Sequence, residues 1–295
     1  MIGAGFGGSA VLVDAVCGYG SSGITNLTNM NSPANATPSI LGIWRLGKPI
    51  HTGRSAALNL AQPADSEGSP RWDYVLKRAV GAQNQAENAR QIAQFTSAAQ
   101  VASHPNLIPV LDASVTGASP YLVMPRLEGT TMQQQIDADV KPLPVALWLI
   151  RQVAQSLVSM HDAGWVHCDI KPENIMVGPR GHVTVIDLGF ATRIHTVSTS
   201  TFRGTPEYAA PEMMQDNMAA MPSADIFALG RILWKWLTCI EPASESMLEP
   251  VADLVQLMVC EQATMRPDAA TITRKLLRLE IDTLGQHIGP TRRAA

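Results

Sequence analysis

Polar side chains suited to phosphoryl transfer gather in one short stretch of the sequence, GWVHCDIKPENIMV, residues 164–177. Asp169, Lys171 and Asn174 lie there between two apolar runs, and Asp187 follows in the next apolar run, VTVIDLG. Catalysis of phosphoryl transfer is mostly positioning and charge stabilisation. It needs a carboxylate to orient a hydroxyl, a cation to neutralise the γ-phosphate, and oxygen ligands for Mg²⁺. We expect Asp169 to orient the hydroxyl and Lys171 to neutralise the γ-phosphate. Asn174 and Asp187 are expected to bind Mg²⁺.

Two kinds of element are expected to hold these side chains in place. Before Gly129 the pattern is strand-like in ILGIWRL, AALNLA, WDYVLKRAV, LIPVLDAS and PYLVMPRL, with one helix over roughly 87–102. After Gly129 the apolar residues Leu147, Ile150 and Leu157 recur at helical spacing. We therefore expect an α+β fold, with a small antiparallel β lobe carrying one main helix and a larger, mainly α-helical lobe. A cleft between two lobes is a usual place for a ligand.

Several short motifs, in order, resemble the eukaryotic-type protein kinase family over about residues 40–280. Asp225 matches the aspartate that holds the backbone of the catalytic loop, and Arg266 matches the arginine that pairs with Glu212. The other matches are His167, Cys168 and Asp169 in the catalytic loop, Asp187, Leu188 and Gly189 in the magnesium loop, and Ala210, Pro211 and Glu212 at the end of the activation segment. The resemblance implies the two-lobed protein kinase fold.

The resemblance also implies a reaction. Lys171, two residues after Asp169, and Thr205 in GTPEYAAPE resemble serine/threonine kinases, especially soluble bacterial ones. The implied activity is transfer of the ATP γ-phosphate to Ser or Thr hydroxyls of protein substrates, with Mg²⁺ or, as an alternative metal, Mn²⁺. Thr205 is then expected to hydrogen-bond near Asp169 and to shape the substrate site.

A second group of residues is expected to bind the nucleotide. Tyr74-Val75-Leu76-Lys77 resembles the strand whose lysine binds the α- and β-phosphates, which makes Lys77 the candidate. PYLVMPRLEG resembles the hinge between the lobes, where the Pro125 carbonyl would accept a hydrogen bond from adenine and the Leu127 N–H would donate one. The remaining candidates are Met124 as the gatekeeper, and Val75 and Met176 on either side of the base.

Two departures from the family pattern concern the phosphate side. The glycine-rich loop is reduced to Gly47 and Gly53 in LGKPIHTGRSAALNLA, and Pro49 lacks an N–H donor. We expect weaker ATP affinity, with Gly47 and Gly53 as the candidate loop residues. Counting back about nine residues from His104-Pro105-Asn106, the usual place of the helix glutamate falls on Gln94 or Phe95. Either the helix is shifted and Glu87 pairs with Lys77, or Lys77 lacks the usual acidic partner.

A third departure is Cys168, which stands where the family has an arginine that contacts a phosphate on the activation segment. Asp169 is intact, so the cysteine is expected to remove regulation by phosphorylation and to leave the catalytic residue in place. We expect activity to be independent of phosphorylation in the activation segment, whose hydroxyl residues are Thr196, Ser198, Thr199, Ser200 and Thr201. The competing hypothesis makes the chain a pseudokinase scaffold with weak or no nucleotide turnover.

Composition limits the remaining possibilities. A net charge of -3 and a pI near 6.2 disfavour a nucleic-acid partner. The four widely spaced cysteines indicate neither a zinc site nor a disulfide framework, which fits a cytoplasmic location. The apolar start SAVLVDAVC is too short to span a membrane.

The sequence divides into a flexible N-terminal tail, 1–38, a kinase domain, 39–282, and a C-terminal tail, 283–295. Within the domain the N-lobe is expected over 39–128 and the C-lobe over 129–282. The glycines of GAGFGG fit a dinucleotide fingerprint, but that motif requires a preceding strand, and Met1 leaves no room for one in this sequence. The segment is therefore interpreted as part of the tail.

Overall fold

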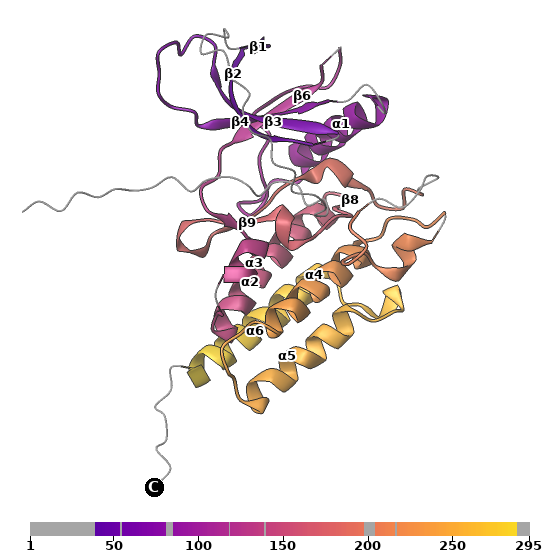
Figure 1. Ribbon diagram of the computed structural model, residues 1–295. Helices are drawn as coiled ribbons and strands as arrows, with labels where there is room; N and C mark the ends of the chain where they lie inside the picture. Colours follow the sequence, from indigo (N-terminus) through magenta and orange to yellow (C-terminus); the bar gives the residue numbers. More distant parts are fainter. Residues whose placement is uncertain are drawn as a thin grey trace, which may run out of the picture.

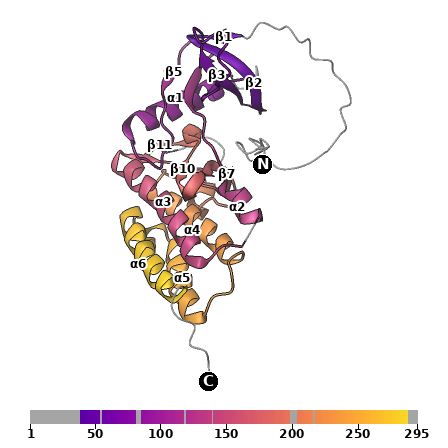
Figure 2. The ribbon, with the colours of Figure 1, turned by 90° about the vertical axis from the view of Figure 1, so that its left-hand side faces the viewer.

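The chain folds into two lobes, a sheet with one helix above and a group of helices below (Figure 1). The computed structural model describes residues 39–53, 55–80, 85–117, 119–138, 140–197, 204–215 and 217–287. The two lobes confirm the predicted α+β architecture, and Figure 2 shows the same division from the side. The predicted N-terminal tail and its GAGFGG motif lie outside the described residues.

Six antiparallel strands form the sheet of the N-lobe, in the order β1-β2-β3-β4-β6-β5. Side chains alternate between the two faces of the central strand β4. Leu76 packs with Trp44 and Val123 on one face, whereas Val75 and Lys77 line the cleft on the other. The strands are β1 Ile40–Leu41, β2 Trp44–Thr52, β3 Ala56–Pro63, β4 Tyr74–Ala79, β5 Asp112–Ser114 and β6 Tyr121–Pro125.

One long helix, α1 (Gln85–Val101), packs against this sheet, close to the predicted range of 87–102. Its buried face carries Ile92, Phe95 and Ala98, each at most 1% exposed. These residues are spaced three apart, so they form one stripe along the helix. The stripe fixes which side chains of α1 face the cleft.

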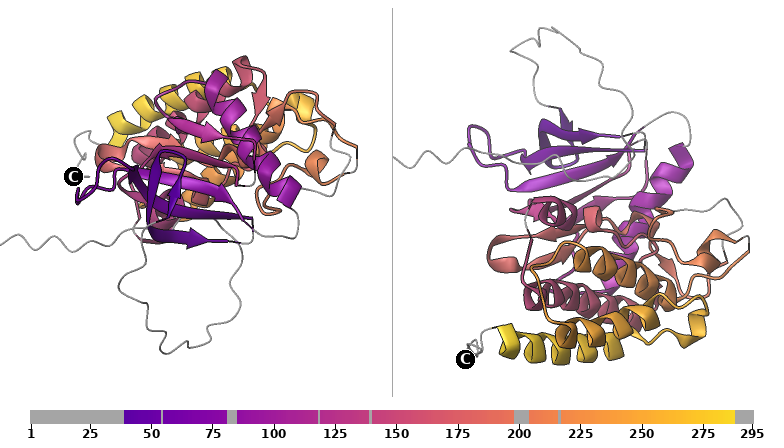
Figure 3. Two further views of the ribbon diagram at one scale, coloured as in Figure 1. Left: turned by 90° about the horizontal axis from the view of Figure 1, so that it is seen from above. Right: turned by 60° about the horizontal axis from the view of Figure 1, so that its bottom comes forward.

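The C-lobe is built around α3, whose predicted apolar positions Leu147, Ile150 and Leu157 are fully buried. Each such burial stabilises the fold by about 1.5–3 kcal/mol. An ion pair of 2.6 Å between Arg151 and Glu280 joins α3 to α6, and the two helices lie side by side (Figure 3). The helices are α2 Met132–Ala138, α3 Leu143–Asp162, α4 Pro222–Leu237, α5 Glu245–Met258 and α6 Ala269–His287.

Short strands and single turns lie between the lobes and carry the polar motifs. The strands are β7 Thr130–Thr131, β8 Trp165–Val166, β9 Ile175–Val177, β10 Val183–Val185 and β11 Thr192–Arg193. β7, β9 and β10 form one small sheet, and β8 pairs with β11. Single 3-10 turns cover Pro172–Asn174, Leu188–Phe190 and Pro211–Met214. These tight elements leave the side chains near Asp169 and Asp187 little freedom.

Two features of the C-lobe concern its boundaries and surface. Helix α6 continues to His287, past position 282 where the sequence pattern placed the end of the domain. Among the described residues, α3 alone is long and apolar enough to cross a membrane, and 67% of its apolar window is buried inside the protein. Burial of this kind is also what the central helix of a packed lobe requires.

Candidate active site

The carboxylate of Asp169 lies at the centre of a buried polar cluster. Its Oδ1 accepts a hydrogen bond of 3.0 Å from the Thr205 hydroxyl, and its Oδ2 accepts one of 2.9 Å from the Asn174 amide. The Lys171 ammonium lies 3.1 Å from Oδ2 and donates to Thr205 at 2.9 Å. Four residues that the sequence placed together by motif therefore meet within hydrogen-bonding distance. The predicted place of Thr205 near Asp169 agrees with this geometry.

The backbone that carries Asp169 is held from below by Asp225 on α4. The Asp225 carboxylate accepts hydrogen bonds from the backbone N–H groups of His167, at 2.8 Å, and Cys168, at 2.9 Å, and it lies 2.9 Å from His161 Nε2. Cys168 has a φ of 66°, a left-handed conformation that is unfavourable for a side chain larger than glycine. The bonds to Asp225 hold the loop in this strained conformation.

Burial raises the pKa of the Asp225 carboxyl, but the hydrogen bond and charge of His161 and the His167 N–H outweigh it, so the pKa lies below 3.8. The ionised carboxylate therefore stabilises the folded protein. This stability is fully present above about pH 4 and is lost as the pH falls through the lowered pKa.

We expect Asp225→Asn to lower the free energy of unfolding by about 3 kcal/mol, because the amide group cannot accept both backbone hydrogen bonds. This corresponds to a melting temperature lower by roughly 6–12 °C at pH 7. The difference from the wild type should begin to shrink below about pH 4, where the carboxyl of the unfolded chain is protonated, and should vanish once the pH falls below the lowered native pKa. Thermal unfolding at several pH values measures both effects. The exposed Asp253 on α5 gives the control Asp253→Asn, and an equal loss in the control would contradict the assignment.

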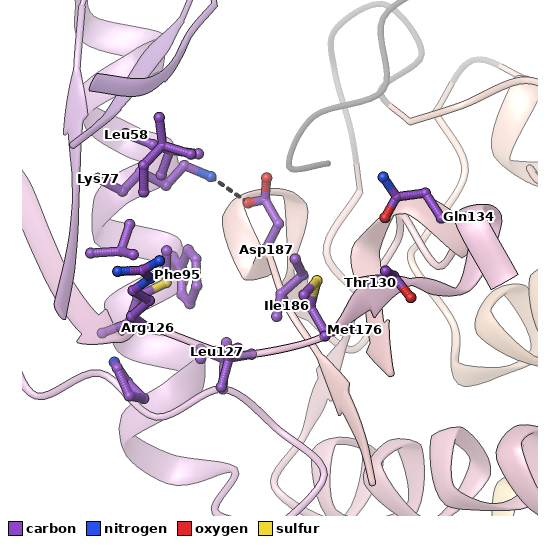
Figure 4. Close-up of a pocket in the computed structure, with 16 residues that line it drawn as sticks. Leu58, Lys77, Phe95, Arg126, Leu127, Thr130, Gln134, Met176, Ile186 and Asp187 are labelled. Carbon is purple, nitrogen blue, oxygen red and sulfur yellow. Dashed lines mark hydrogen bonds and ion pairs between the residues drawn. The ribbon is translucent and has the colours of Figure 1, made fainter. Parts of the chain in front are cut away.

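A second polar centre joins the two lobes. Lys77 on β4 donates to Asp187 with an Nζ–Oδ1 distance of 2.5 Å, across 110 residues of sequence, as the dashed line in Figure 4 shows. The same oxygen accepts the Gly189 N–H at 3.2 Å. Burial raises the pKa of the Asp187 carboxyl, but the charge and hydrogen bond of Lys77 outweigh it, and the pKa is lowered. Asp187 is therefore ionised at neutral pH.

An apolar pocket lies beside this ion pair, between the sheet and the C-lobe (Figure 4). Val75 lines it from β4 of the N-lobe, Met176 lines it from β9, and the hinge residues Met124, Pro125 and Leu127 also belong to its lining. These are the residues expected to hold an adenine base. Thr130 and Gln134 add polar groups at the opposite edge, as Figure 4 shows. A mainly apolar pocket with a few polar groups at its rim suits a flat base carrying a polar tail.

The donor set next to the pocket fits a magnesium ion. Among the described residues no group of three or more His, Cys, Asp or Glu side chains could hold a metal. Mg²⁺, however, is usually bound by one or two protein oxygens together with phosphate oxygens and water. Asp187 offers a carboxylate. The side-chain N–H₂ of Asn174 donates to Asp169, so the side-chain oxygen of Asn174 points away from the Asp169 carboxylate. These two side chains would hold the ion.

Comparisons with known proteins agree with this geometry. The family model described as "Protein kinase domain" matches residues 70–284, more than half of the sequence. The chain belongs to the protein kinase domain family. It is 31% identical over 190 residues to the probable serine/threonine-protein kinase pknA2 of Bifidobacterium longum, covering 63% of this chain and 23% of the relative. It is 32% identical over 210 residues to the serine/threonine-protein kinase PrkC of Bacillus subtilis, covering 68% and 31%. The chain thus matches less than a third of the length of either relative.

The remaining motif of the kinase domain is in place as well. Arg266 donates to both carboxylate oxygens of Glu212, at 2.6 and 2.9 Å, and its Nε donates to the Cys260 carbonyl at 2.7 Å. The Arg266 side chain is fully buried, so this bidentate pair ties the end of the activation segment to the lobe. Its role is structural.

The glycine loop of the kinase domain has a register that the sequence did not predict. Ile50 on β2 and Leu58 on β3 line the pocket, so the hairpin between these strands is the one that would lie over the phosphates of a bound nucleotide. Gly53 lies in that hairpin. Gly47 does not face the pocket, because a Cβ atom placed on it would lie 2.6 Å from the Trp72 ring. The assignment of Gly47 to the nucleotide site is therefore corrected, and Ile50 and Leu58 take its place.

The register of α1 decides between the two alternatives for the helix glutamate. Phe95, not Glu87, lies against Lys77, with 5.4 Å between the Lys77 Nζ and the centre of the Phe95 ring. Glu87 pairs with Arg90 at 2.7 Å in the first turn of the helix, about 12 Å from Phe95 along the axis. Glu87 therefore lies away from Lys77, and the position counted back from His104 carries a phenylalanine.

Sequence analysis missed the pocket residues that match no polar motif, namely Ile50, Leu58, Phe95, Ile108, Ile186, Arg126, Gly129, Thr130 and Gln134. One signal could have found Ile186, since it precedes Asp187 on the same apolar run. The count of nine residues back from His104 reaches Phe95 as an alternative for the helix position, but it does not indicate that the ring lines the pocket.

Proposed function

We propose that this protein is a serine/threonine protein kinase that uses ATP and a divalent metal, Mg²⁺ or Mn²⁺. The observation that carries this proposal is the buried cluster of Asp169, Lys171, Asn174 and Thr205 beside the Lys77–Asp187 pair, because four oriented groups of this kind serve a reaction and not a scaffold. The names of the bacterial relatives support the same reaction class.

Each residue has a specific task in this mechanism. Asp169 orients the Ser or Thr hydroxyl of the protein substrate and accepts its proton. Lys171, held on Thr205 and Asp169, neutralises charge on the transferred phosphoryl group. Lys77 holds the α- and β-phosphates, and Asn174 and Asp187 hold the metal, which when bound offsets the charge of the phosphates. All five groups lie on tight loops or a central strand, so little reorganisation is needed.

The phosphate loop is expected to bind weakly. The Gly53 N–H donates to the Ala56 carbonyl at 2.9 Å within the hairpin. A backbone donor that is already used cannot contact a phosphate. Affinity for ATP therefore depends mainly on the apolar pocket, Lys77 and the metal.

We further propose that activity does not require phosphorylation of the activation segment. Two backbone hydrogen bonds anchor the start of this segment, from His195 N to the Ala220 carbonyl and from Ala220 N to the Thr196 carbonyl, both 2.9 Å. Cys168 has no charge to offer a phosphate, and burial together with the nearby Asp225 raises the pKa of its thiol, which keeps it neutral. Backbone pairing supplies the anchor that an arginine and a phosphate would otherwise provide.

Replacement of the hydroxyl residues of the activation segment by alanine should leave the transfer rate within about twofold of the wild type. On this proposal, activity does not depend on an ion pair that a phosphate on the segment would form. The residues to replace are Thr196, Ser198, Thr199, Ser200 and Thr201; positions 198–201 lie outside the described residues. Initial rates with a generic basic protein substrate measure this. Thr271→Ala, on α6, is the control. A tenfold or larger loss confined to the activation-segment variant would contradict the proposal.

The second candidate function is a pseudokinase scaffold that binds nucleotide without turnover. Phe95 in the place of the helix glutamate favours it, as does the reduced glycine loop. The two functions differ in one measurement: incubation with radiolabelled ATP, Mg²⁺ and a basic protein, followed by phosphoamino-acid analysis. Label on Ser and Thr supports the kinase. Nucleotide binding without label supports the scaffold, and label mainly on Tyr would contradict the proposed specificity.

The partners and the location of the protein belong to the same proposal. Protein substrates with Ser or Thr follow from the kinase reaction, whereas nucleic acid does not fit the net charge of -3. We propose a cytoplasmic location for this domain, because its cysteines suit a reducing compartment. Cys168, Cys239 and Cys260 are free thiols in the described part of the chain.

A further inference from the structure

Phe95 lies directly beneath the amine of Lys77, in the buried region between α1 and the cleft. The ring centre is 5.4 Å from the Lys77 Nζ, Phe95 is 1% exposed, and Lys77 is 5% exposed. Figure 4 shows the ring and the lysine on the same side of the pocket, with Asp187 opposite. The ammonium group therefore contacts both an aromatic ring and a carboxylate.

The position of this ring is fixed by the fold around it. α1 packs on the turn that carries Asp187, since a Cβ atom placed on Gly189 would lie 3.6 Å from Gln91 Cβ. Gln91 precedes Phe95 by one helical turn, so both side chains lie on the same face of α1. Phe95 itself packs in the main core with Ile108 and Met124. The ring cannot turn away from Lys77 without opening that core.

A buried ring attracts a cation more strongly than an exposed one. The face of an aromatic ring carries partial negative charge, and it attracts an ammonium within about 6 Å of its centre more strongly when both groups are shielded from water. Leucine could fill much of the same space but offers no such attraction. The chemistry at position 95 is therefore suited to a cation.

We propose that Phe95 is a positioning residue that holds Lys77 in place for nucleotide binding through a cation–π contact. The inference rests on the proposed function, because it concerns the same ATP site. The ring takes the place that an acidic side chain has in related kinases. The ring is neutral, so this contact does not neutralise the charge that Lys77 would offer to the phosphates, and Asp187 would remain the carboxylate for a bound metal.

The contact can be tested by changing the ring electrostatics at constant shape. Fluorinated phenylalanines are incorporated at position 95, ending with pentafluorophenylalanine, whose ring face no longer attracts cations. We expect the Kd for ATP, measured by calorimetry with and without Mg²⁺, to rise stepwise with fluorination and to reach about tenfold. Phe95→Leu should give a similar rise. Ile92→Leu is the matched control, because Ile92 is equally buried on α1 but does not line the pocket.

A spectroscopic measurement separates the contact from nucleotide binding. The sequence has six lysines, so the side-chain signals of Lys77 can be assigned with Lys77→Met. We expect a ring-current shift of the Lys77 methylene next to the amine, lost in Phe95→Leu and kept in Ile92→Leu.

The outcomes distinguish two kinds of failure. If the wild type binds ATP and fluorination leaves the Kd within twofold, Phe95 only fills the core and the inference is wrong. A wild type that shows the ring-current shift but neither binds ATP nor transfers phosphate would overturn the proposed function, and with it the role of Phe95 in nucleotide binding.

Discussion

Asp169→Asn should reduce the rate of phosphate transfer by about a thousandfold, with little change in the Kd for ATP. In the proposed mechanism this carboxylate orients the substrate hydroxyl and takes its proton, and a positioned general base contributes about 10²–10⁴ in rate. The amide has the same shape but is neutral and far less basic. A loss in kcat with unchanged nucleotide affinity is therefore the expected signature.

The same substitution also changes the hydrogen bonds around position 169. Asn174 and Thr205 both donate to the carboxylate, and an amide oxygen can replace only part of this acceptance. We expect a melting temperature lower by only a few °C, since one hydrogen bond contributes about 1 kcal/mol. The matched control is Asp162→Asn, at the exposed end of α3. Transfer by Asp169→Asn at the wild-type rate would contradict the mechanism.

Asp187→Asn should reduce transfer to a similar degree, but for a different reason. Asp187 is the proposed carboxylate ligand for the metal and the partner of Lys77 at 2.5 Å. Its loss removes the charge that attracts Mg²⁺ and leaves the buried ammonium of Lys77 without this carboxylate. We expect at least a hundredfold slower transfer and a higher Mg²⁺ concentration for half-maximal activity.

Thermal unfolding gives a second measurement for Asp187. A ligand that binds only the folded protein raises the melting temperature according to its concentration and Kd. ATP with Mg²⁺ should stabilise the wild type more than ATP alone, and chelation by EDTA should abolish the difference. In Asp187→Asn the two conditions should be nearly equal. A normal magnesium response in this variant would show that other groups hold the metal.

Three members of the cluster around Asp169 were predictable because they are close in the chain, whereas Thr205 was expected there from the family resemblance. Asp169, Lys171 and Asn174 lie on one loop, and the single turn Pro172–Asn174 brings the asparagine back to the aspartate. The large helices were predictable for a similar reason. The periodicity of α3 needs only a local pattern and one buried face.

The register of the glycine loop could not be obtained in this way. Register shifts lie on both sides of Pro49, between Leu46 and Pro49 and between Pro49 and His51. Each shift changes which side chains face the pocket. Counting glycines in the sequence therefore selected Gly47, whereas packing against Trp72 places it elsewhere.

The polar motifs, their order and the helical periodicity are properties of neighbouring residues, so the sequence alone determined the kinase family, the two lobes and the groups around Asp169. The Lys77–Asp187 pair, the ring of Phe95 beneath it and the pairing of His195 with Ala220 join segments distant in the chain. Such contacts depend on how α1, the sheet and the activation segment pack together. Only the tertiary structure could decide them, because side chains far apart in sequence meet through packing and not through local spacing.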